Sequence, residues 1–176
     1  KFWNDMDNKK IKKAYFSKYK NIWYHGDFIQ KTQNGGFIML GRSDTTLNPG
    51  GVRMGTAEIY RQVENIEFVR ESLVVGQNWK DDVRIILFVV METKKKLGVE
   101  EINFIKSKIK DNCSPKHVPH KVIEISEIPI TKSGKIVELA VKKAIHGENI
   151  ENLEVLSNPE SIKFFKNLYE KGLLNE

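Results

Sequence analysis

The sequence has 176 residues, of which 40% are hydrophobic and 30% are charged, and its formal net charge is +6. This size and composition fit one globular, soluble domain, or one domain with a piece of another, and exclude a disordered chain. No apolar run approaches the roughly 20 residues that span a bilayer. The single cysteine, Cys113, excludes an internal disulfide and fits a reducing compartment.

The first part of the chain is predicted to be rich in β-structure. It starts at Lys1 without an initiator Met or a signal-peptide pattern, so we expect a piece of a longer protein. The polar stretch 5–20 predicts a surface helix or loop. Strands over 28–32 and 37–40 flank Asn34-Gly35-Gly36, which tolerates the positive φ of a tight turn, so a hairpin is predicted there. A polar linker over 41–46 and a second turn over 48–51 follow.

The second part alternates helices and strands. Apolar spacing predicts helices from Thr56 and over 100–112 and 136–146, and strands over 72–76, 84–91 and 118–125, with a turn at 78–82 and a polar loop at 126–135. The run 85–90 is typical of a strand buried on both faces. The last helix is predicted to start with Asn158 as its cap and Pro159 at its first position. Its expected apolar stripe is Ile162, Phe165, Leu168 and Tyr169.

This order predicts an α+β fold. We expect a small mixed domain with a short β-hairpin and a central three-stranded sheet flanked by helices. A β-rich remnant of a larger domain is expected to precede it. The boundary is placed near Asp44, which gives units 1–43 and 44–176.

Two polar motifs in the first part could bind a nucleotide. Asp27, at an aromatic strand, could accept hydrogen bonds from two ribose hydroxyls, although a turn-forming Asp explains it locally. In Gly41-Arg42-Ser43-Asp44, the fork of Arg42 could bind ribose or phosphate oxygens, and Asp44 lies at the expected linker. A surface ion pair is the alternative for this motif.

Two further motifs lie in the second part. Gly50-Gly51-Val52-Arg53 joins a flexible backbone to a cation, and a plain hairpin turn is the alternative. Thr131–Lys135 holds two lysines in a polar loop that lacks the spacing of a Walker P-loop. A lysine on a flexible stem could reach into a site built by another domain, and a solvated loop lysine is the alternative.

Other kinds of site find little support. The four histidines, including His117 and His120 on either side of Pro119, lack a plausible metal spacing, and no Ser/His/Asp triad is suggested. Basic residues form no stripe interleaved with aromatics, so no nucleic-acid partner is expected.

Taken in order, the polar motifs resemble the late motifs of the adenylate-forming enzymes, a superfamily that includes acyl-CoA synthetases, firefly luciferase and non-ribosomal adenylation domains. The resemblance spans nearly the whole chain. It is strongest to the acetoacetate–CoA ligases. Acetyl-CoA synthetases usually carry an Arg-rich stretch after the lysine loop, where Glu138 and Leu139 stand here. The residues that carry the resemblance are Phe2–Asp5, Tyr24–Asp27, Gly41–Asp44, Gly50–Arg61, Ser114–Pro119 and Pro129–Lys135.

The resemblance implies a two-step reaction. A carboxylate such as acetoacetate attacks the α-phosphate of Mg²⁺-ATP, and the thiol of coenzyme A then displaces AMP. It implies Lys135 as the catalytic residue, Asp27 and Arg42 on the ribose, and Arg53 facing a phosphate. It also implies Asp44 as the hinge of a mobile carboxy-terminal domain, Gly50 and Gly51 at coenzyme A, no metal ligand in this chain, and a cytoplasmic enzyme.

The phosphate loop and acyl pocket of the family would lie in an amino-terminal domain that precedes this chain. We therefore expect the chain alone not to catalyse the complete reaction, and Lys135 to be exposed and mobile in it. Two alternatives remain open from the sequence. One is another short-chain acyl-CoA synthetase, such as an acetyl-CoA synthetase, and the other is a non-catalytic basic binding module.

Overall fold

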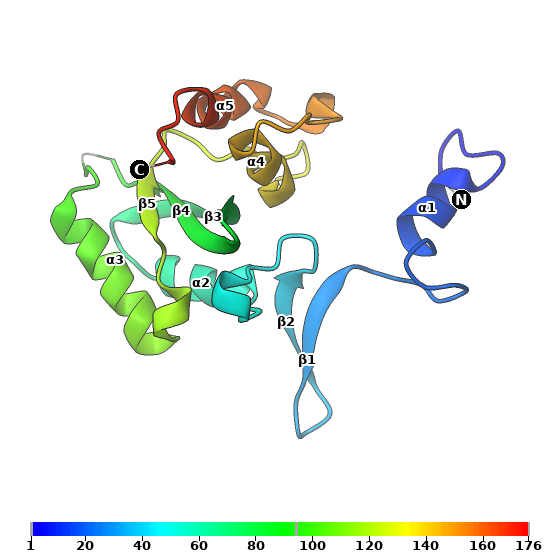
Figure 1. Cartoon of the computed structure of the whole chain (residues 1–176), viewed down its shortest axis with the longest axis horizontal. Coiled ribbons are helices and arrows are strands. Elements are labelled where there is room, and N and C mark those ends of the chain that lie inside the picture. Colours follow the sequence, from blue (N-terminus) through cyan, green and yellow to red (C-terminus); the bar gives the residue numbers. More distant parts are fainter. Residues whose placement is uncertain (1, 94, 176) are drawn as a thin grey trace.

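A central sheet with helices on both faces organises most of the chain (Figure 1). The computed structural model describes residues 2–93 and 95–175. Strand β3 (Val69–Trp79) pairs antiparallel with β4 (Asp82–Met91), and β4 pairs parallel with β5 (Lys121–Glu124), so β4 is the middle strand. The predicted three-stranded sheet flanked by helices is confirmed.

The two faces of β4 belong to two different cores. Leu87 and Val89 pack with the buried residues of α2 (Thr56–Val63) and α3 (Val99–Asn112). Ile86 and Phe88 pack with α4 (Glu138–Ile145) and α5 (Ile162–Glu170) on the opposite face. Because successive strand residues point to opposite faces, a strand between two helical layers must be apolar at every position. The prediction of a strand buried on both faces is confirmed.

The predicted hairpin consists of β1 (Asp27–Lys31) and β2 (Phe37–Arg42), which pair antiparallel. It packs against the start of α2. A Cβ added at Gly55 would lie 1.7 Å from the carbonyl oxygen of Leu40, so only glycine permits this approach. The hairpin and α2 therefore touch across the boundary placed near Asp44, and the division into two units stays a prediction.

The amino-terminal helix α1 (Lys9–Tyr15) stands apart from the layered unit in Figure 1 and buries none of its residues. Asp5 fixes its start, because its carboxylate accepts the amides of Lys10 at 2.8 Å and Ile11 at 2.9 Å. The shorter elements are the 3-10 turns η1 (Pro49–Gly51), η2 (Pro115–His117), η3 (Leu153–Val155) and η4 (Pro159–Ser161). Among the described helices, none combines the length and apolar character needed to cross a bilayer.

Several predicted boundaries were wrong. β3 and β4 continue to the pair Trp79–Asp82, so a two-residue turn replaces the expected 78–82 turn. Strand β5 starts at Lys121 instead of at 118, after η2. Helix α4 starts at Glu138 instead of at 136, because Ile136 forms a β-bridge with Ile130.

The start of the last helix also differs from the prediction. Asn158 makes no capping hydrogen bond, and Pro159 opens the 3-10 turn η4 that precedes α5. Within α5, Ile162, Phe165 and Leu168 are buried as predicted, whereas Tyr169 is 52% exposed. The apolar stripe is therefore one residue shorter than expected.

Candidate functional site

Asp27 and Arg42 face each other at the open end of the hairpin. They are paired in the β1–β2 register, and Nη1 of Arg42 lies 3.6 Å from Oδ1 of Asp27. The same guanidinium binds both carboxylate oxygens of Asp44, with Nη2–Oδ2 at 3.1 Å and Nε–Oδ1 at 3.3 Å. The hydrogen bond to Asp44 raises the pKa of Arg42. The structure thus brings three of the predicted site residues into one cluster.

Gly26 makes room for this cluster. Its φ is +89°, and an added Cβ would lie 3.1 Å from Nη2 of Arg42. Nη1 of Arg42 donates to the carbonyl of His25 at 3.2 Å, so the guanidinium packs across the backbone. The imidazole of His25 contacts the second oxygen of Asp27. A ribose bound by Asp27 would therefore take the place of His25, whose side chain is 73% exposed.

Ser43 connects the motif Tyr24–Asp27 to the motif Gly41–Asp44, a contact that the sequence did not indicate. Its hydroxyl donates to the carbonyl of Gly26 at 3.0 Å and also contacts the phenol of Tyr24. Lys18 donates to the same phenol oxygen at 3.2 Å. The hydrogen bond with Ser43 is the largest cause that lowers the pKa of Tyr24, followed by the bond from Lys18. The only sequence signal is the presence of Tyr24 and Ser43 inside the two motifs.

The glycine motif forms a turn at the end of the β3–β4 hairpin. Its ends meet in a β-bridge between Leu47 and Met54. Gly50 donates its amide to both carboxylate oxygens of Asp82, at 2.8 and 3.0 Å. Gly51 has φ +78°, and an added Cβ there would meet nothing within 4 Å. The backbone at Gly51 is thus open to a thin ligand, while Asp82 holds its neighbour.

Asp82 was missed in the sequence because it lies 32 residues from Gly50. Its pKa is lowered, first by the amide of Val83 and then by that of Gly50. The carboxylate is therefore ionised at neutral pH and accepts both amides. Arg53 is exposed. The predicted contacts of Arg53 with a phosphate and of Gly51 with coenzyme A stay predictions.

The lysine loop is a small hairpin. Thr131 donates its amide to the carbonyl of Lys135 at 2.8 Å, and its hydroxyl accepts the amide of Lys135 at 3.0 Å. Gly134 closes the turn with φ +78° and donates to the carbonyl of Thr131. The side chain of Lys135 is exposed, as predicted. Its mobility stays a prediction, but the backbone that carries it is hydrogen-bonded.

The tail of the chain anchors this hairpin. Lys132 donates its amide to the carbonyl of Val155 at 3.0 Å, and the amide of Ser157 donates to the carbonyl of Ile130 at 2.9 Å. The side chain of Asn158 accepts the amide of Ile130 at 3.0 Å. Residues 155–158 thus form a strap, hereafter the tail strap, against which the hairpin is built.

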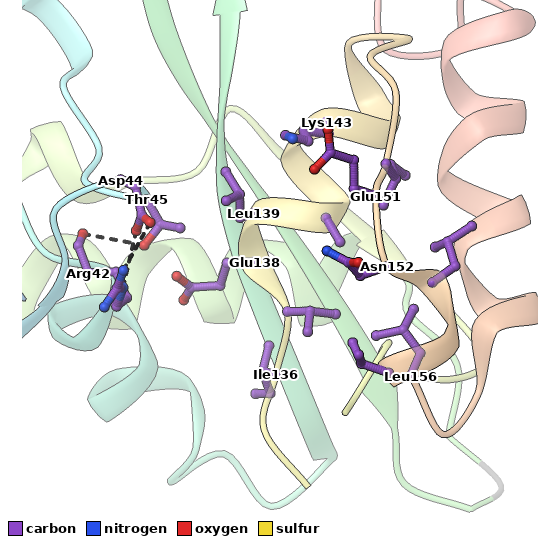
Figure 2. Close-up of a pocket in the computed structure, with 15 residues that line it drawn as sticks. Arg42, Asp44, Thr45, Ile136, Glu138, Leu139, Lys143, Glu151, Asn152 and Leu156 are labelled. Carbon is purple, nitrogen blue, oxygen red and sulfur yellow. Dashed lines mark hydrogen bonds and ion pairs between the residues drawn. The ribbon is translucent and has the colours of Figure 1, made fainter. Parts of the chain in front are cut away.

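A groove of about 520 Å³ joins the motif Gly41–Asp44 to the exit of the lysine hairpin (Figure 2). Arg42 and Asp44 line one side, and Ile136 and Glu138 line the other. The apolar floor includes Leu153 and Leu156 from the region of the tail strap. Residues that lie about 90 positions apart in the printed sequence therefore share one groove, although Gly50–Arg53 do not line it.

A Ser–His–Glu series is present that the sequence did not suggest. Oγ of Ser114 lies 2.8 Å from Nδ1 of His117, and Nε2 of His117 lies 2.9 Å from Oε2 of Glu58. Ser114 and Glu58 each also accept a backbone hydrogen bond. The hydroxyl of Ser114 accepts the amide of Lys116, and Glu58 accepts the amide of Gly55. This series therefore serves to hold η2 against the start of α2.

Potential metal ligands do not gather in this part of the protein. Over residues 2–93 and 95–175, no three His, Cys, Asp or Glu side chains are grouped so that they could hold a metal ion.

Comparison with known proteins places this geometry in a family. A scan against models of protein families found no match. The chain is 52% identical over 169 residues to the acetoacetyl-coenzyme A synthetase of Rhizobium meliloti, and 45% identical over 171 residues to the acetoacetyl-CoA synthetase of Xenopus tropicalis. Each match covers 96% of this chain. The chain is thus similar, over nearly its whole length, to acetoacetyl-CoA synthetases.

A solved relative has the same fold. The acetoacetyl-CoA synthetase of Streptomyces lividans superposes with a TM-score of 0.89 and 38% identity over 97% of this chain. The chain spans only about a quarter of these family members, with 26% of the Rhizobium meliloti protein and 26% of the Streptomyces lividans chain covered. The predicted resemblance to acetoacetate–CoA ligases is therefore confirmed, for a part of the length of these relatives.

Proposed function

We propose that the protein carrying this chain is an ATP-dependent acetoacetate–CoA ligase, and that the chain is its carboxy-terminal part. The reaction joins acetoacetate to coenzyme A in two steps and releases pyrophosphate and then AMP. The observation that carries this proposal is 52% identity to an acetoacetyl-coenzyme A synthetase over 96% of the chain. An exposed Lys135 on a hydrogen-bonded backbone, directly before Ile136 in the groove that Arg42 and Asp44 also line, supports it chemically.

Lys135 acts in the first step. The carboxylate of acetoacetate attacks the α-phosphate of ATP, so two anions approach each other and the transition state gathers negative charge. A lysine ammonium placed there stabilises that charge more than it stabilises the separated substrates. Asp27 and Arg42 hold the ribose, and Arg53 faces a phosphate. Mg²⁺ supplied with ATP would neutralise part of the phosphate charge, and no described residue is proposed to hold it.

The second step follows a rotation about Asp44. The bidentate pair of Arg42 and Asp44 must then open, and this costs little because both side chains are about half exposed. Backbone changes at a hinge are absorbed where few contacts cross. The turn at Gly50 and Gly51 then lines the path of the coenzyme A thiol, which displaces AMP from the acyl-adenylate.

The division of labour in the chain follows from this scheme. Residues 1–43 end a large ATP- and acyl-binding domain, and residues 44–176 form the mobile domain with the catalytic lysine. The amino-terminal remainder of the protein supplies the phosphate loop and the acyl pocket. The single cysteine fits a cytoplasmic enzyme.

A substrate panel on the full-length protein tests the proposal. Pyrophosphate release is measured with ATP, coenzyme A and one carboxylic acid at a time, with acetoacetate, acetate and propionate as the acids. We expect acetoacetate to give the highest kcat/KM. A higher value with acetate would assign a different ligase of the superfamily, and no release with any acid would overturn the ligase.

A further inference from the structure

Tyr60 connects three elements next to Glu138, a residue that lines the groove. It lies on α2, and its phenol oxygen accepts the backbone amide of Val74 in β3 at 3.1 Å. The same hydroxyl donates to Oε1 of Glu138, the first residue of α4, at 2.6 Å. Helices α2 and α4 cover opposite faces of the sheet. Tyr60 is thus a direct polar link between the two helical layers.

The direction of these hydrogen bonds is fixed by chemistry. The amide of Val74 can only donate, and an ionised carboxylate can only accept. The phenol proton must therefore point at Glu138. Burial, followed by the charge of Glu138, raises the pKa of Tyr60 well above its ordinary value, so the phenol stays protonated and remains a donor.

Glu138 stands where the lysine hairpin ends. Lys135 precedes it by three residues, and Ile136 between them pairs with Ile130. Val137 at the helix cap offers no side-chain hydrogen bond to the first turn of α4. Glu138 also lines the groove opposite Arg42 and Asp44. Figure 2 shows its carboxylate pointing across the groove toward these two residues. The position of Glu138 therefore sets where the hairpin joins the start of α4.

We propose that Tyr60 is a positioning residue for the adenylation step, which acts through Glu138 to hold Lys135 in register with the groove. This inference rests on the proposed function. A lysine that serves a transition state must be placed closely, since a 1 Å displacement can cost about 100-fold in rate. The link also runs to α2, which begins soon after the glycine motif.

Helix α4 has other contacts that hold it on the sheet. Helix α4 is held on the sheet by Val141, Ala144 and Ile145, each of which is at most 2% exposed. Removal of one hydroxyl should therefore release the first turn of α4 and the hairpin before it, and leave the layers in place. This separates positioning from folding, because the two effects are read by different measurements.

The test uses the full-length protein with Tyr60→Phe, Glu138→Ala and the double variant, and with Tyr169→Phe as the matched control. Tyr169 is half exposed on α5 and lies outside the groove. Adenylation is followed by acetoacetate-dependent exchange of pyrophosphate into ATP, and the second step by thioester formation from preformed acetoacetyl-adenylate. Far-UV circular dichroism and Tm report folding.

We expect Tyr60→Phe to lower kcat for adenylation about tenfold with the KM for ATP unchanged, because a displaced Lys135 weakens a contact that it makes only in the transition state. Thioester formation should change less than about twofold, and the double variant should lose no more than Glu138→Ala alone. Tyr169→Phe should match the wild type.

Equal losses in both half-reactions, or strictly additive effects of the two substitutions, would overturn the positioning role. So would wild-type adenylation in Tyr60→Phe. A wild-type protein that exchanges no pyrophosphate with any acid would instead overturn the proposed function, so the two failures are distinguishable.

Discussion

Asn158 accepts the backbone amide of Ile130 at 3.0 Å, 28 residues away in the chain. The same side chain donates to the carbonyl of Ile128 at 2.9 Å and to Glu127 at 2.8 Å. An asparagine expected to cap the last helix thus bridges the segment that leads into the lysine hairpin. The tail strap is consequently part of the candidate site and not only of the carboxy-terminal packing.

Asn158→Ala should destabilise the chain by about 2 kcal/mol, because it leaves the partly buried amide of Ile130 without its acceptor. Urea unfolding followed by circular dichroism measures this change. Asn167→Ala is the matched control, since Asn167 is exposed on α5. It should stay within about 0.5 kcal/mol of the parent chain. Equal unfolding midpoints for Asn158→Ala and the control would show that the hydrogen bonds of Asn158 contribute nothing to stability.

Gly55→Ala should be the more damaging of two glycine substitutions. The new methyl group would lie 1.7 Å from the carbonyl oxygen of Leu40, and backbone cannot move aside as a side-chain tip can. We expect a loss of about 3 kcal/mol in unfolding free energy, at the upper end of overpacking effects. Gly36→Ala is the control, because its methyl group would meet only the hydroxyl of Thr32 at 3.2 Å. Similar Tm values for both variants would contradict the close packing of the hairpin on α2.

Asp82→Ala should impair the coenzyme A step selectively. Without the carboxylate the turn at Gly50 is no longer held, so the KM for coenzyme A should rise roughly fivefold at unchanged kcat, as for a loss of uniform binding. Pyrophosphate exchange, which needs no coenzyme A, should be unaffected. Asp81→Ala is the matched control on the adjacent, exposed residue. A loss of pyrophosphate exchange in Asp82→Ala would contradict this prediction, because it would show that the turn serves adenylation.

The contact between Asp82 and Gly50 should also persist in acid. The pKa of Asp82 lies below its ordinary value of 3.8, so the stabilisation it gives is present above that value and is lost as pH falls through the lower folded pKa. The amide proton shift of Gly50, followed by NMR from pH 7 downward, should titrate with a midpoint below 3.8. In Asp82→Asn the shift should not titrate. A midpoint above the ordinary value in the parent chain would contradict the lowered pKa.

Short-range patterns predicted most of the fold. The continuous apolar run 85–90 located the strand between two helical layers, and Asn34-Gly35-Gly36 located the hairpin, because both signals depend only on neighbouring residues. The boundaries failed where distant residues decide them. Ile136 pairs with Ile130 instead of starting the expected helix. Asn158 accepts the amide of the same Ile130 instead of capping the last helix.

The site was predictable only in part for the same reason. Asp27, Arg42 and Asp44 could be proposed because each stands in a compact motif, and the structure groups them. Tyr60 and Asp82 were missed, because Tyr60 meets Glu138 from 78 residues away and Asp82 meets Gly50 from 32. Such partners are fixed by the topology of the sheet, which local spacing does not specify.

The role of Lys135 is tested most directly by Lys135→Ala in the full-length protein, with both half-reactions measured side by side. We predict a loss of pyrophosphate exchange by at least about 100-fold, as for removal of a charge that stabilises the transition state. Thioester formation from preformed acetoacetyl-adenylate should fall less than about threefold. Lys132→Ala, in the same hairpin, should retain both activities. Equal loss of both half-reactions in Lys135→Ala, or wild-type pyrophosphate exchange, would contradict the assignment of Lys135 as the catalytic residue of adenylation.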